Sequence, residues 1–250
     1  LGRSNVNLAG GAESMSRVGH NLQSARFGQK MGHVKAVDMM TGALTDPFGN
    51  GHMGITAENV AKKMSITRQR QDELAYNSHL RASKAINAGY FKEQILPVVI
   101  QTGKKQEVFD TDEHLRKQVN LQDFSKLKPA FDRDGTVTAG NSSGINDGAS
   151  ALVLANKSAI SKYSMPVMAK IISYGVGGVA PNLMGLGPIP ATREALSSAG
   201  LNISQIDCIE SNEAFAAQAC AVAGELDFDP AKTNPNGGAI ALGHPVGASG

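Results

Sequence analysis

The chain has 250 residues, 41% of them hydrophobic and 18% charged, which is the balance of an ordinary globular protein. A formal net charge of +2 without any dense Lys/Arg run excludes a nucleic-acid surface and an acidic tail. No run approaches the roughly eighteen apolar residues of a membrane helix, and the two cysteines, Cys208 and Cys220, are too few for a disulfide framework. We therefore expect no membrane partner, no signal peptide and a reducing, cytoplasmic location.

In chain order, the first predicted element is a short strand at Val6–Ala9 that runs into a turn at Gly10-Gly11. From there to about Gly54 the sequence is rich in Gly, Met and His and has weak periodicity, which predicts a long irregular excursion. Thr56 is suited to cap a helix that begins at Ala57.

A second helix is predicted to start after Thr67 and to stop near Gly89. Its apolar and small residues recur at helical spacing on one face: Leu74, Ala75, Ser78, Ala82 and Ala85. Ile95–Ile100 is β-like, and Lys104–Lys128 is polar and predicted to face solvent.

The second half alternates predicted strands and helices. The expected strands are Ala149–Ala155, Val167–Tyr174 and Ile206–Ile209, and the expected helices are Lys157–Lys162, Ala191–Ala199 with Gly200 at its end, and a helix opened by Asn212 that continues through Phe215 to Ala223. The continuous apolar run Ala149–Ala155 is typical of a strand that is covered on both faces. This alternation indicates an α/β layered fold.

Two polar residues stand where ligands collect in such folds. Asn212 lies where a strand ends and a helix starts, although a helix cap is the commoner role at such a junction. His244, between Gly243 and Pro245 in a glycine-rich turn, is suited to act as a general base or to bind an oxyanion, or else bonds a nearby carbonyl.

Other site classes fit less well. The glycine-rich stretch Gly243–Gly250 lacks the Gly-Lys-Ser/Thr ending of a phosphate-binding loop and the spacing of a dinucleotide fingerprint, so a nucleotide-binding module is a weak alternative. The six histidines are scattered without metal-ligand spacing, so no metal site is expected. Cys208, in a predicted strand, and Cys220, in an Ala-rich helix, are typical packing cysteines and not nucleophiles.

Five segments together resemble the thiolase family, most closely its bacterial acetyl-CoA acetyltransferases. They are Gly10-Gly11-Ala12-Glu13-Ser14-Met15-Ser16, His52-Met53-Gly54, Thr136 through Ala149, Asn212-Glu213-Ala214-Phe215-Ala216-Ala217-Gln218, and Asn236 through Pro245. The resemblance covers essentially the whole chain, and Asn-Glu-Ala-Phe followed by Gly-Gly-Ala-Ile-Ala-Leu-Gly-His-Pro is specific in combination.

The resemblance implies an α/β thiolase fold, in which two similar halves stack in five layers (α-β-α-β-α) and a loop domain is inserted in the first half. Residues 1–14 would then end the N-terminal half, and residues 15–145 would form the loop domain. Residues 146–164 would return to the N-terminal half, and residues 165–250 would form a truncated C-terminal half.

The resemblance also implies a two-step reaction in which a cysteine thiolate takes the acyl group and passes it to coenzyme A or to a second acyl-CoA. His244 matches the histidine that activates the nucleophile, and Asn212 matches the asparagine that orients a water in the oxyanion hole. No resident cofactor is expected, since the coenzyme A thioesters are the substrates. Residues that would line the coenzyme A site are Leu44, His52, Met53, Arg116, Ala139, Ser143, Met184, Ala214 and Phe215. The His52-Met53 pair favours acetyl-CoA and acetoacetyl-CoA, and a homodimer or homotetramer is expected.

Both cysteines that the family uses are absent. The nucleophile would precede Leu1, and the second, in a Cys-x-Gly-Gly-Gly stretch, would follow Gly250. We therefore expect the chain to be an internal fragment, truncated at both ends and inactive by itself. Two alternatives are a non-catalytic thiolase-like protein that binds acyl-CoA or lipid, and a condensing relative such as a ketoacyl synthase. The second is not expected to carry Asn212-Glu213-Ala214-Phe215 together with Gly243-His244-Pro245.

Overall fold

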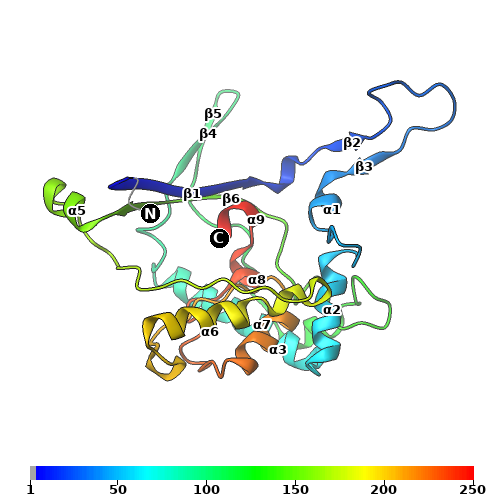
Figure 1. Ribbon diagram of the computed structural model, residues 1–250. Helices are drawn as coiled ribbons and strands as arrows, with labels where there is room; N and C mark the ends of the chain where they lie inside the picture. The colour runs from blue at the N-terminus through cyan, green and yellow to red at the C-terminus, as the bar shows by residue number, and fades with distance from the viewer. Residues whose placement is uncertain (1–3) are drawn as a thin grey trace.

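The computed structural model describes residues 4–250, so the first three residues of the predicted 1–14 segment lie outside the described residues. A long pair of strands lies along one side of a layer of helices (Figure 1). The strands are β1 Val6–Ser14, β2 His20–Leu22, β3 Ala36–Asp38, β4 Val98–Thr102, β5 Lys105–Phe109 and β6 Asp147–Ala155. The α-helices are α1 Met39–Ala43, α2 Met53–Lys63, α3 Arg68–Asn87, α4 Leu121–Ser125, α5 Lys157–Tyr163, α6 Pro188–Ala199, α7 Ala216–Glu225, α8 Ala239–Leu242 and α9 Val246–Ser249. Short 3₁₀ turns are η1 Met15–Arg17, η2 Pro181–Leu186 and η3 Ile203–Gln205.

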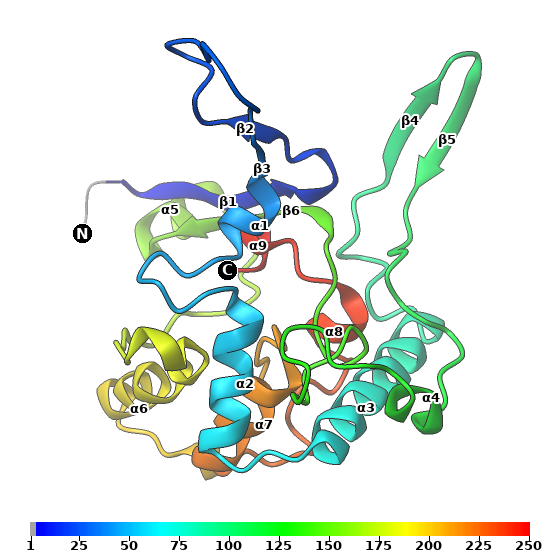
Figure 2. The ribbon, with the colours of Figure 1, turned by 90° about the vertical axis from the view of Figure 1, so that its right-hand side faces the viewer.

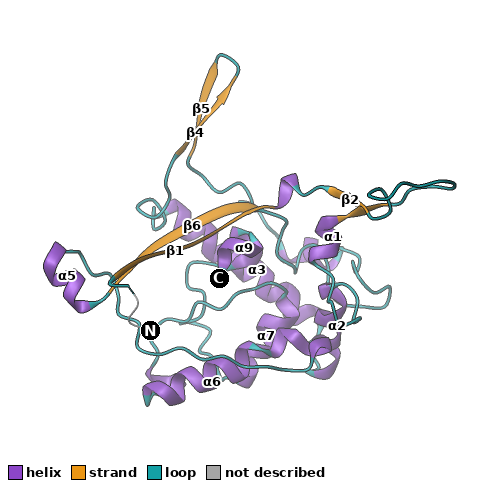
Figure 3. Ribbon diagram, turned by 45° about the horizontal axis from the view of Figure 1, so that its top comes forward, coloured by secondary structure: helices purple, strands orange, loops and turns teal. Residues whose placement is uncertain are grey.

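Strands β1 and β6 pair antiparallel over their whole length, from Val6 opposite Ala155 to Ser14 opposite Asp147. The turn predicted at Gly10-Gly11 was therefore wrong, because β1 continues through both glycines. A side chain at Gly11 would overlap the carbonyl of Gly247, so this glycine allows α9 to approach the strand closely. Figure 3 shows α9 next to the strand pair.

The contact between α9 and the strand pair includes polar groups. The Gly247 N–H donates to the Glu13 carboxylate at 3.2 Å, and the Ser150 hydroxyl donates to the Ala248 carbonyl at 3.0 Å. The C-terminal helix is thereby fixed to a strand near the start of the described chain.

The apolar strand β6 is exposed, although its sequence predicted a strand covered on both faces. Leu152 is 65% exposed and Val153 is 60% exposed, so the prediction of a strand buried on both faces was wrong. In the described part of the chain β1 is the only strand that pairs with β6, and the pair forms a two-stranded sheet. A two-stranded sheet leaves most of its side chains in solvent unless other layers pack on it.

The core lies instead among α2, α3, α7 and α8, which pack against one another below the strand pair (Figures 1 and 2). Small side chains dominate this contact and allow the helix backbones to approach closely. The buried hydrophobic residues of these four helices are Ala57, Val60, Ala61, Ala75, Ala82, Ala85, Ala216, Ala217, Ala219, Cys220, Ala221, Val222, Ile240 and Ala241. This helical layer carries the ordered part of the site.

Local capping signals were correct for one helix and wrong for another. Thr67 caps α3, its side chain accepting from the Arg70 N–H, and Gly89 follows the helix with a φ of +76°, as the sequence predicted. The start predicted at Ala57 was wrong. Helix α2 begins at Met53 and is capped by His52, and the hydroxyl of Thr56 donates inside the helix to the Met53 carbonyl.

Two predicted strands do not form in the described structure. Val167–Tyr174 has no regular structure, and Ile206–Ile209 forms only an isolated parallel bridge between Ile209 and Thr233. A strand needs a neighbouring strand along its length to pair its backbone groups. Within residues 4–250 no strand pairs with Val167–Tyr174, and the second segment is bonded to its neighbour only at Ile209. Two of the helices predicted in this half were correct: α5 is present, and α6 ends at Gly200 with a φ of +68°. The helix predicted to open at Asn212 starts later, at Ala216.

Two hairpins project from the body (Figure 2). One joins β2 to β3, within the excursion that the sequence predicted to be irregular, and the other joins β4 to β5. The polar stretch Lys104–Lys128 is not wholly solvent-facing as predicted, since Leu115 and Phe124 are buried against the helical layer. No helix within residues 4–250 is long and apolar enough to cross a membrane.

Candidate active site

Asn212 lies ahead of α7, and its side chain does not cap the helix. Helix α7 begins at Ala216 with Phe215 at its N-cap position and no side-chain cap. The amide Nδ2 of Asn212 instead donates to Nε2 of His244 at 3.3 Å. The cap interpretation is therefore wrong, and the two residues selected from the sequence as chemically active are direct neighbours.

The turn that carries His244 depends on Gly243. This glycine has a φ of +102°, and a side chain on it would contact the Asn146 side chain at 2.8 Å. The Asn146 Oδ1 accepts from the His244 backbone N–H at 3.0 Å. Asn146 and Gly243 together fix the backbone from which the imidazole extends.

The imidazole of His244 is held in one tautomer. Because the Asn212 amide nitrogen is a donor, Nε2 acts as the acceptor and the proton resides on Nδ1. Nδ1 then donates to the Ser249 hydroxyl at 2.8 Å. Burial lowers the pKa of His244, so the ring is neutral at pH 7 and Nε2, which accepts from Asn212, is its unprotonated nitrogen.

The segment from Asn141 to Ser143 lies against the segment that leads into α7. The Ser143 N–H and hydroxyl both donate to the Ala214 carbonyl at 3.0 Å. The Ala216 N–H donates to the Asn141 carbonyl at 2.8 Å, and Ser142 forms an antiparallel bridge with Phe215. The predicted site residues Ser143, Ala214 and Phe215 are thereby brought together from distant parts of the chain.

An aromatic row connects His52 to this segment. The His52 ring stacks on Phe131 with centroids 4.8 Å apart, and Phe131 meets Phe215 edge-on at 6.0 Å. His52 also caps α2, with Nδ1 accepting from the Gly54 N–H at 3.0 Å, and burial lowers its pKa. His52 is therefore a neutral, structurally engaged residue beside Phe215.

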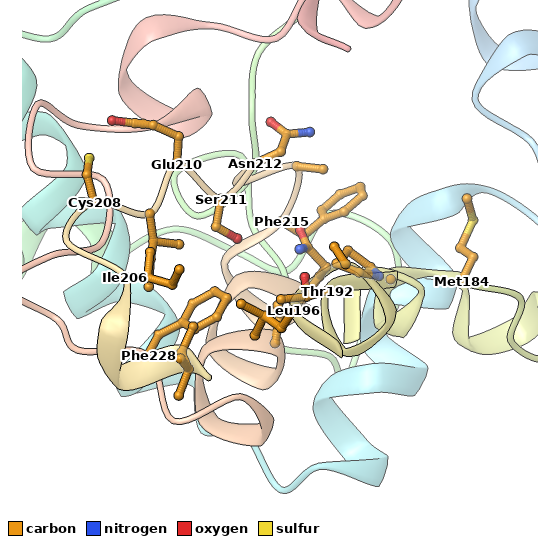
Figure 4. A pocket seen from close by; sticks show the side chains of 18 of the residues that line it. Met184, Thr192, Leu196, Ile206, Cys208, Glu210, Ser211, Asn212, Phe215 and Phe228 are labelled. Carbon is orange, nitrogen blue, oxygen red and sulfur yellow. The ribbon is translucent and has the colours of Figure 1, made fainter. Parts of the chain in front are cut away.

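A cavity of about 670 Å³ lies between η2, α6 and the segment before α7 (Figure 4). Its walls are mainly apolar, with Phe228, Leu196 and Ile206 among the side chains drawn in Figure 4. Five of the predicted site residues line it: Met53, Met184, Asn212, Ala214 and Phe215. Such a cavity suits an apolar chain whose polar end lies near Asn212.

A smaller cavity of about 180 Å³ has a mixed lining that includes one arginine, two histidines and Asp123. The predicted residues Arg116 and Ala139 line it, together with His79 and His114. Burial, with repulsion from His114 and Arg116, lowers the pKa of His79 to about 4. Burial also lowers the pKa of His114, whose Nε2 lies 3.1 Å from the Ile240 carbonyl oxygen. The exposed Arg116 is the permanent cation at this cavity.

The predicted residues do not form a single pocket. Leu44, His52, Ser143 and His244 line neither of these two cavities. Leu44 ends α1, and its carbonyl accepts from the Met53 N–H at 2.8 Å, so it supports the start of α2.

Sequence reasoning missed the residues that hold the site. Asn146, Phe131 and Ser249 contact predicted residues but lie outside the candidate set, as does a buried cluster around Glu213. Glu213 carried a usable signal, because it is an acidic residue next to Asn212 at the entry to an Ala-rich helix. Phe131 and Ser249 carried no local signal.

Neither cysteine contacts His244. Cys220 is buried, its Sγ is 3.7 Å from the Arg70 carbonyl, and burial raises its pKa to about 11. Cys208 is exposed, and the strand that was predicted to contain it does not form there. Among residues 4–250, no three His, Cys, Asp or Glu side chains gather in a way that would hold a metal ion.

The chain is similar to known proteins over its whole length. It is 55% identical to "Beta-ketothiolase BktB" of Cupriavidus necator and 50% identical to "Acetyl-CoA acetyltransferase" of Rhizobium meliloti, and both alignments cover 100% of this chain. The chain spans 64% and 63% of the length of these two relatives.

Solved structures give the same result. The crystal structure of the Bacillus anthracis acetyl-CoA acetyltransferase matches with a TM-score of 0.96 at 45% identity, over 100% of this chain and 63% of the other. The crystal structure of human mitochondrial 3-ketoacyl-CoA thiolase matches with a TM-score of 0.95 at 44% identity, over 99% of this chain and 63% of the other. These matches confirm the predicted thiolase fold.

Family assignments divide the chain in two. Residues 1–158 match the family described as "Thiolase, N-terminal domain", and residues 165–250 match "Thiolase, C-terminal domain". Together these matches cover well over half of the sequence. The chain therefore belongs to the thiolase family.

Proposed function

We propose that the whole protein that contains this chain is an acetyl-CoA C-acetyltransferase. It condenses two molecules of acetyl-CoA reversibly to acetoacetyl-CoA and coenzyme A. The observation that carries this proposal is the contact between Asn212 and the neutral imidazole of His244. The names of the relatives, acetyl-CoA acetyltransferase and beta-ketothiolase, agree with it.

His244 supplies the base in this reaction. Its Nε2 accepts the proton of a cysteine thiol, and the resulting thiolate attacks the thioester carbonyl of acetyl-CoA. The carbonyl oxygen gains negative charge, which His244 and a water oriented by Asn212 stabilise. Coenzyme A leaves as its thiolate and takes up the proton, and the acetyl group remains on the cysteine as a thioester.

The nucleophile comes from outside the described residues. The ring nitrogens of His244 face Asn212 and Ser249, so neither Cys208 nor Cys220 is placed to lose its proton to this base. The 250-residue chain alone therefore performs no thiolysis. In the second step, another cysteine removes an α-proton from a second acetyl-CoA, and the resulting enolate attacks the carbonyl carbon of the acetyl-cysteine. The bond between the acetyl group and the cysteine sulfur breaks, so that acetoacetyl-CoA is released and the first cysteine leaves as a thiolate.

The two cavities suit different parts of a coenzyme A thioester. The apolar cavity beside Met184 and Phe215 is suited to the acyl group and pantetheine. The smaller cavity offers Arg116 as a cation for the anionic nucleotide end, and Ala139 also lines it. Ser143 lies four residues further along the chain and bonds to Ala214. A related structure is titled human mitochondrial 3-ketoacyl-CoA thiolase in complex with CoA. The His52-Met53 pair supports a preference for short acyl chains.

The remaining features of the whole protein belong to the same proposal. They are a cytoplasmic location, a homodimer or homotetramer, and a loop domain at residues 15–145 inserted between residues 1–14 and 146–164, followed by the C-terminal half from residue 165. The pairing of β1 with β6, which joins the two ends of this insertion, supports the partition.

The test uses the whole protein with acetoacetyl-CoA and coenzyme A as substrates. A His244→Ala change is expected to lower kcat/KM by about 100- to 10,000-fold, the usual contribution of a positioned general base. The matched control is His33→Ala, since His33 is exposed on the β2–β3 connection. Equal activity of the two variants, or no thiolysis by the wild-type protein, would overturn the proposal. Thiolysis by the 250-residue chain alone that is lost in its His244→Ala variant would overturn the assignment of the nucleophile.

A further inference from the structure

A buried cluster of three polar side chains includes the residue that follows Asn212 in the chain. Ser78 comes from α3, Glu213 follows Asn212, and Asn234 lies on the segment that leads to α8. They are 3%, 4% and 5% exposed, respectively. A buried carboxylate without a salt-bridge partner destabilises the fold unless hydrogen bonds satisfy it. The position of Glu213 therefore needs a structural or functional explanation.

The Glu213 carboxylate accepts three hydrogen bonds from three separate segments. The Ser78 hydroxyl donates at 2.7 Å, Asn234 Nδ2 at 2.9 Å and the Ile240 N–H at 3.2 Å. The Ser78 oxygen in turn accepts from the Gly238 N–H at 3.0 Å. Glu213 therefore ties the chain beside Asn212 to α8, the helix that ends just before Gly243 and His244.

Asn234 holds the other side of Asn212. Its Oδ1 accepts from the Ser211 N–H at 2.7 Å, and its Nδ2 donates to the Ser211 carbonyl at 2.8 Å. It adopts a φ of +45°, a conformation that asparagine tolerates better than most residues. Ser211 and Glu213, which flank Asn212 on both sides, are thus both bonded to the segment that leads to His244.

We propose that Glu213 is a positioning residue that sets the distance between Asn212 and His244, acting through Asn234 and through the backbone of α8. The proposal rests on the function proposed above, because it assigns a role within the same reaction. Glu213 touches no reacting atom. It fixes the backbone beside the exposed Asn212 and ahead of the half-buried His244, in addition to the bonds that His244 makes to Asn146 and Ser249.

The geometry requires a carboxylate at this position. All three partners of Glu213 are donors, and a carboxylate only accepts, whereas the amide of glutamine would place its own N–H₂ group against one of them. Space is equally restricted, because a methyl group on Gly238 would overlap the carboxylate. Glu213→Gln therefore changes the hydrogen bonding and leaves the size of the side chain unchanged.

Two readouts test the proposal separately from the proposed function. In the 250-residue chain, the ¹⁵N resonances of the His244 ring report its contact with Asn212 and are assigned with a His244→Gln variant. Asn212→Ala and Glu213→Gln are expected to shift the Nε2 resonance in the same direction. Ser78→Ala removes one of the three donors to Glu213 and is expected to shift the Nε2 resonance in the same direction by a smaller amount. This variant replaces Glu213→Gln in the test if Glu213→Gln fails to fold. Thr67→Ala, a loss of the α3 cap far from the cluster, is the matched structural control and is expected to give no shift.

In the whole protein, Glu213→Gln is expected to lower kcat by about 10- to 100-fold while KM stays within about twofold, as for a misplaced catalytic group. His244 resonances that stay unchanged in Glu213→Gln and Ser78→Ala, but move in Asn212→Ala, would overturn the positioning role. A kcat loss no larger than that of Thr67→Ala would also overturn it. A wild-type protein without thiolysis would reject the proposed function, and the resonance comparison in the chain would still decide the role of Glu213.

Discussion

The helical layer and the β1–β6 strand pair both contain aliphatic side chains, but these side chains end in opposite environments. Val60 in α2 is fully buried, whereas Val153 in β6 is 60% exposed. The helices α2, α3, α7 and α8 cover one another, while each of the two strands has only the other as a strand partner within residues 4–250. The contrast shows that the elements around Asn212 are stabilised by the helices, whereas apolar side chains of the strand pair stay exposed within residues 4–250.

The largest expected effect comes from placing the same charge in both regions. Val60→Asp is expected to lower the free energy of unfolding by about 3–5 kcal/mol, because it buries an unpaired carboxylate. Val153→Asp in the same 250-residue chain is expected to change it by about 0.5 kcal/mol or less, because the site is exposed.

Urea unfolding monitored by circular dichroism measures both values. In the whole protein the contrast is expected to narrow, because further layers would cover β6. If the two variants lowered the free energy of unfolding of the 250-residue chain equally, the proposed difference between the two regions would be contradicted.

Acid is expected to weaken the helical layer first. The pKa of the buried His79 in α3 is lowered to about 4, below the roughly 6.5 of an unfolded histidine. The stability that comes from burying neutral His79 is therefore fully present above pH 6.5. It is lost as the pH falls from 6.5 towards 4, because in this range the unfolded chain binds a proton on this histidine and the folded chain does not. The loss is on the order of 2–3 kcal/mol.

Urea unfolding at pH 7 and pH 4.5 tests this pH dependence. His79→Gln is expected to flatten it, whereas His33→Gln, at an exposed position, leaves it as in the wild type. Neither β1 nor β6 contains a histidine, so hydrogen exchange should accelerate in α3 before it does in the strand pair. Parallel pH profiles for His79→Gln and the wild-type chain would contradict this role of His79.

The smallest expected effect separates a helix cap from a site residue within the helical layer. Thr67 accepts from the Arg70 N–H, so Thr67→Ala is expected to cost about 1 kcal/mol of stability. Asn212→Ala is expected to leave stability within about 0.5 kcal/mol, because its side chain is exposed and caps nothing.

The effects of these two variants on enzyme activity are expected to be in the reverse order of their effects on stability. In the whole protein, Asn212→Ala lowers kcat by about 100-fold and Thr67→Ala leaves it nearly unchanged. Thermal unfolding and steady-state thiolysis give the two comparisons. A stability loss in Asn212→Ala as large as that in Thr67→Ala would restore the cap interpretation.

Local patterns predicted the features that depend on neighbours in the sequence. Thr67 and Gly89 marked the ends of α3, and Gly200 marked the end of α6, because caps and left-handed glycines act within one helical turn. Val167–Tyr174 failed as a strand because strand formation depends on a partner that the local sequence does not specify.

In the candidate site, too, the sequence indicated single residues but not the contacts between them. His244 was recognisable from its glycine and proline neighbours, and Asn212 from its junction, but their contact was not visible in the sequence. The cluster of Ser78, Glu213 and Asn234 joins residues more than a hundred positions apart, and nothing in the local composition indicates such a connection. The thiolase resemblance supplied the candidate residues, and the residues that contact them came only from the three-dimensional structure.

The contact between α9 and β1 bears on how the molecule is assembled. Gly247 bonds to Glu13, so this contact joins residues that are more than two hundred positions apart. Contacts between such distant residues contribute to slow folding. The imidazole of His244 bonds to Ser249 in α9, so its orientation depends on a helix that is itself held by this long-range contact.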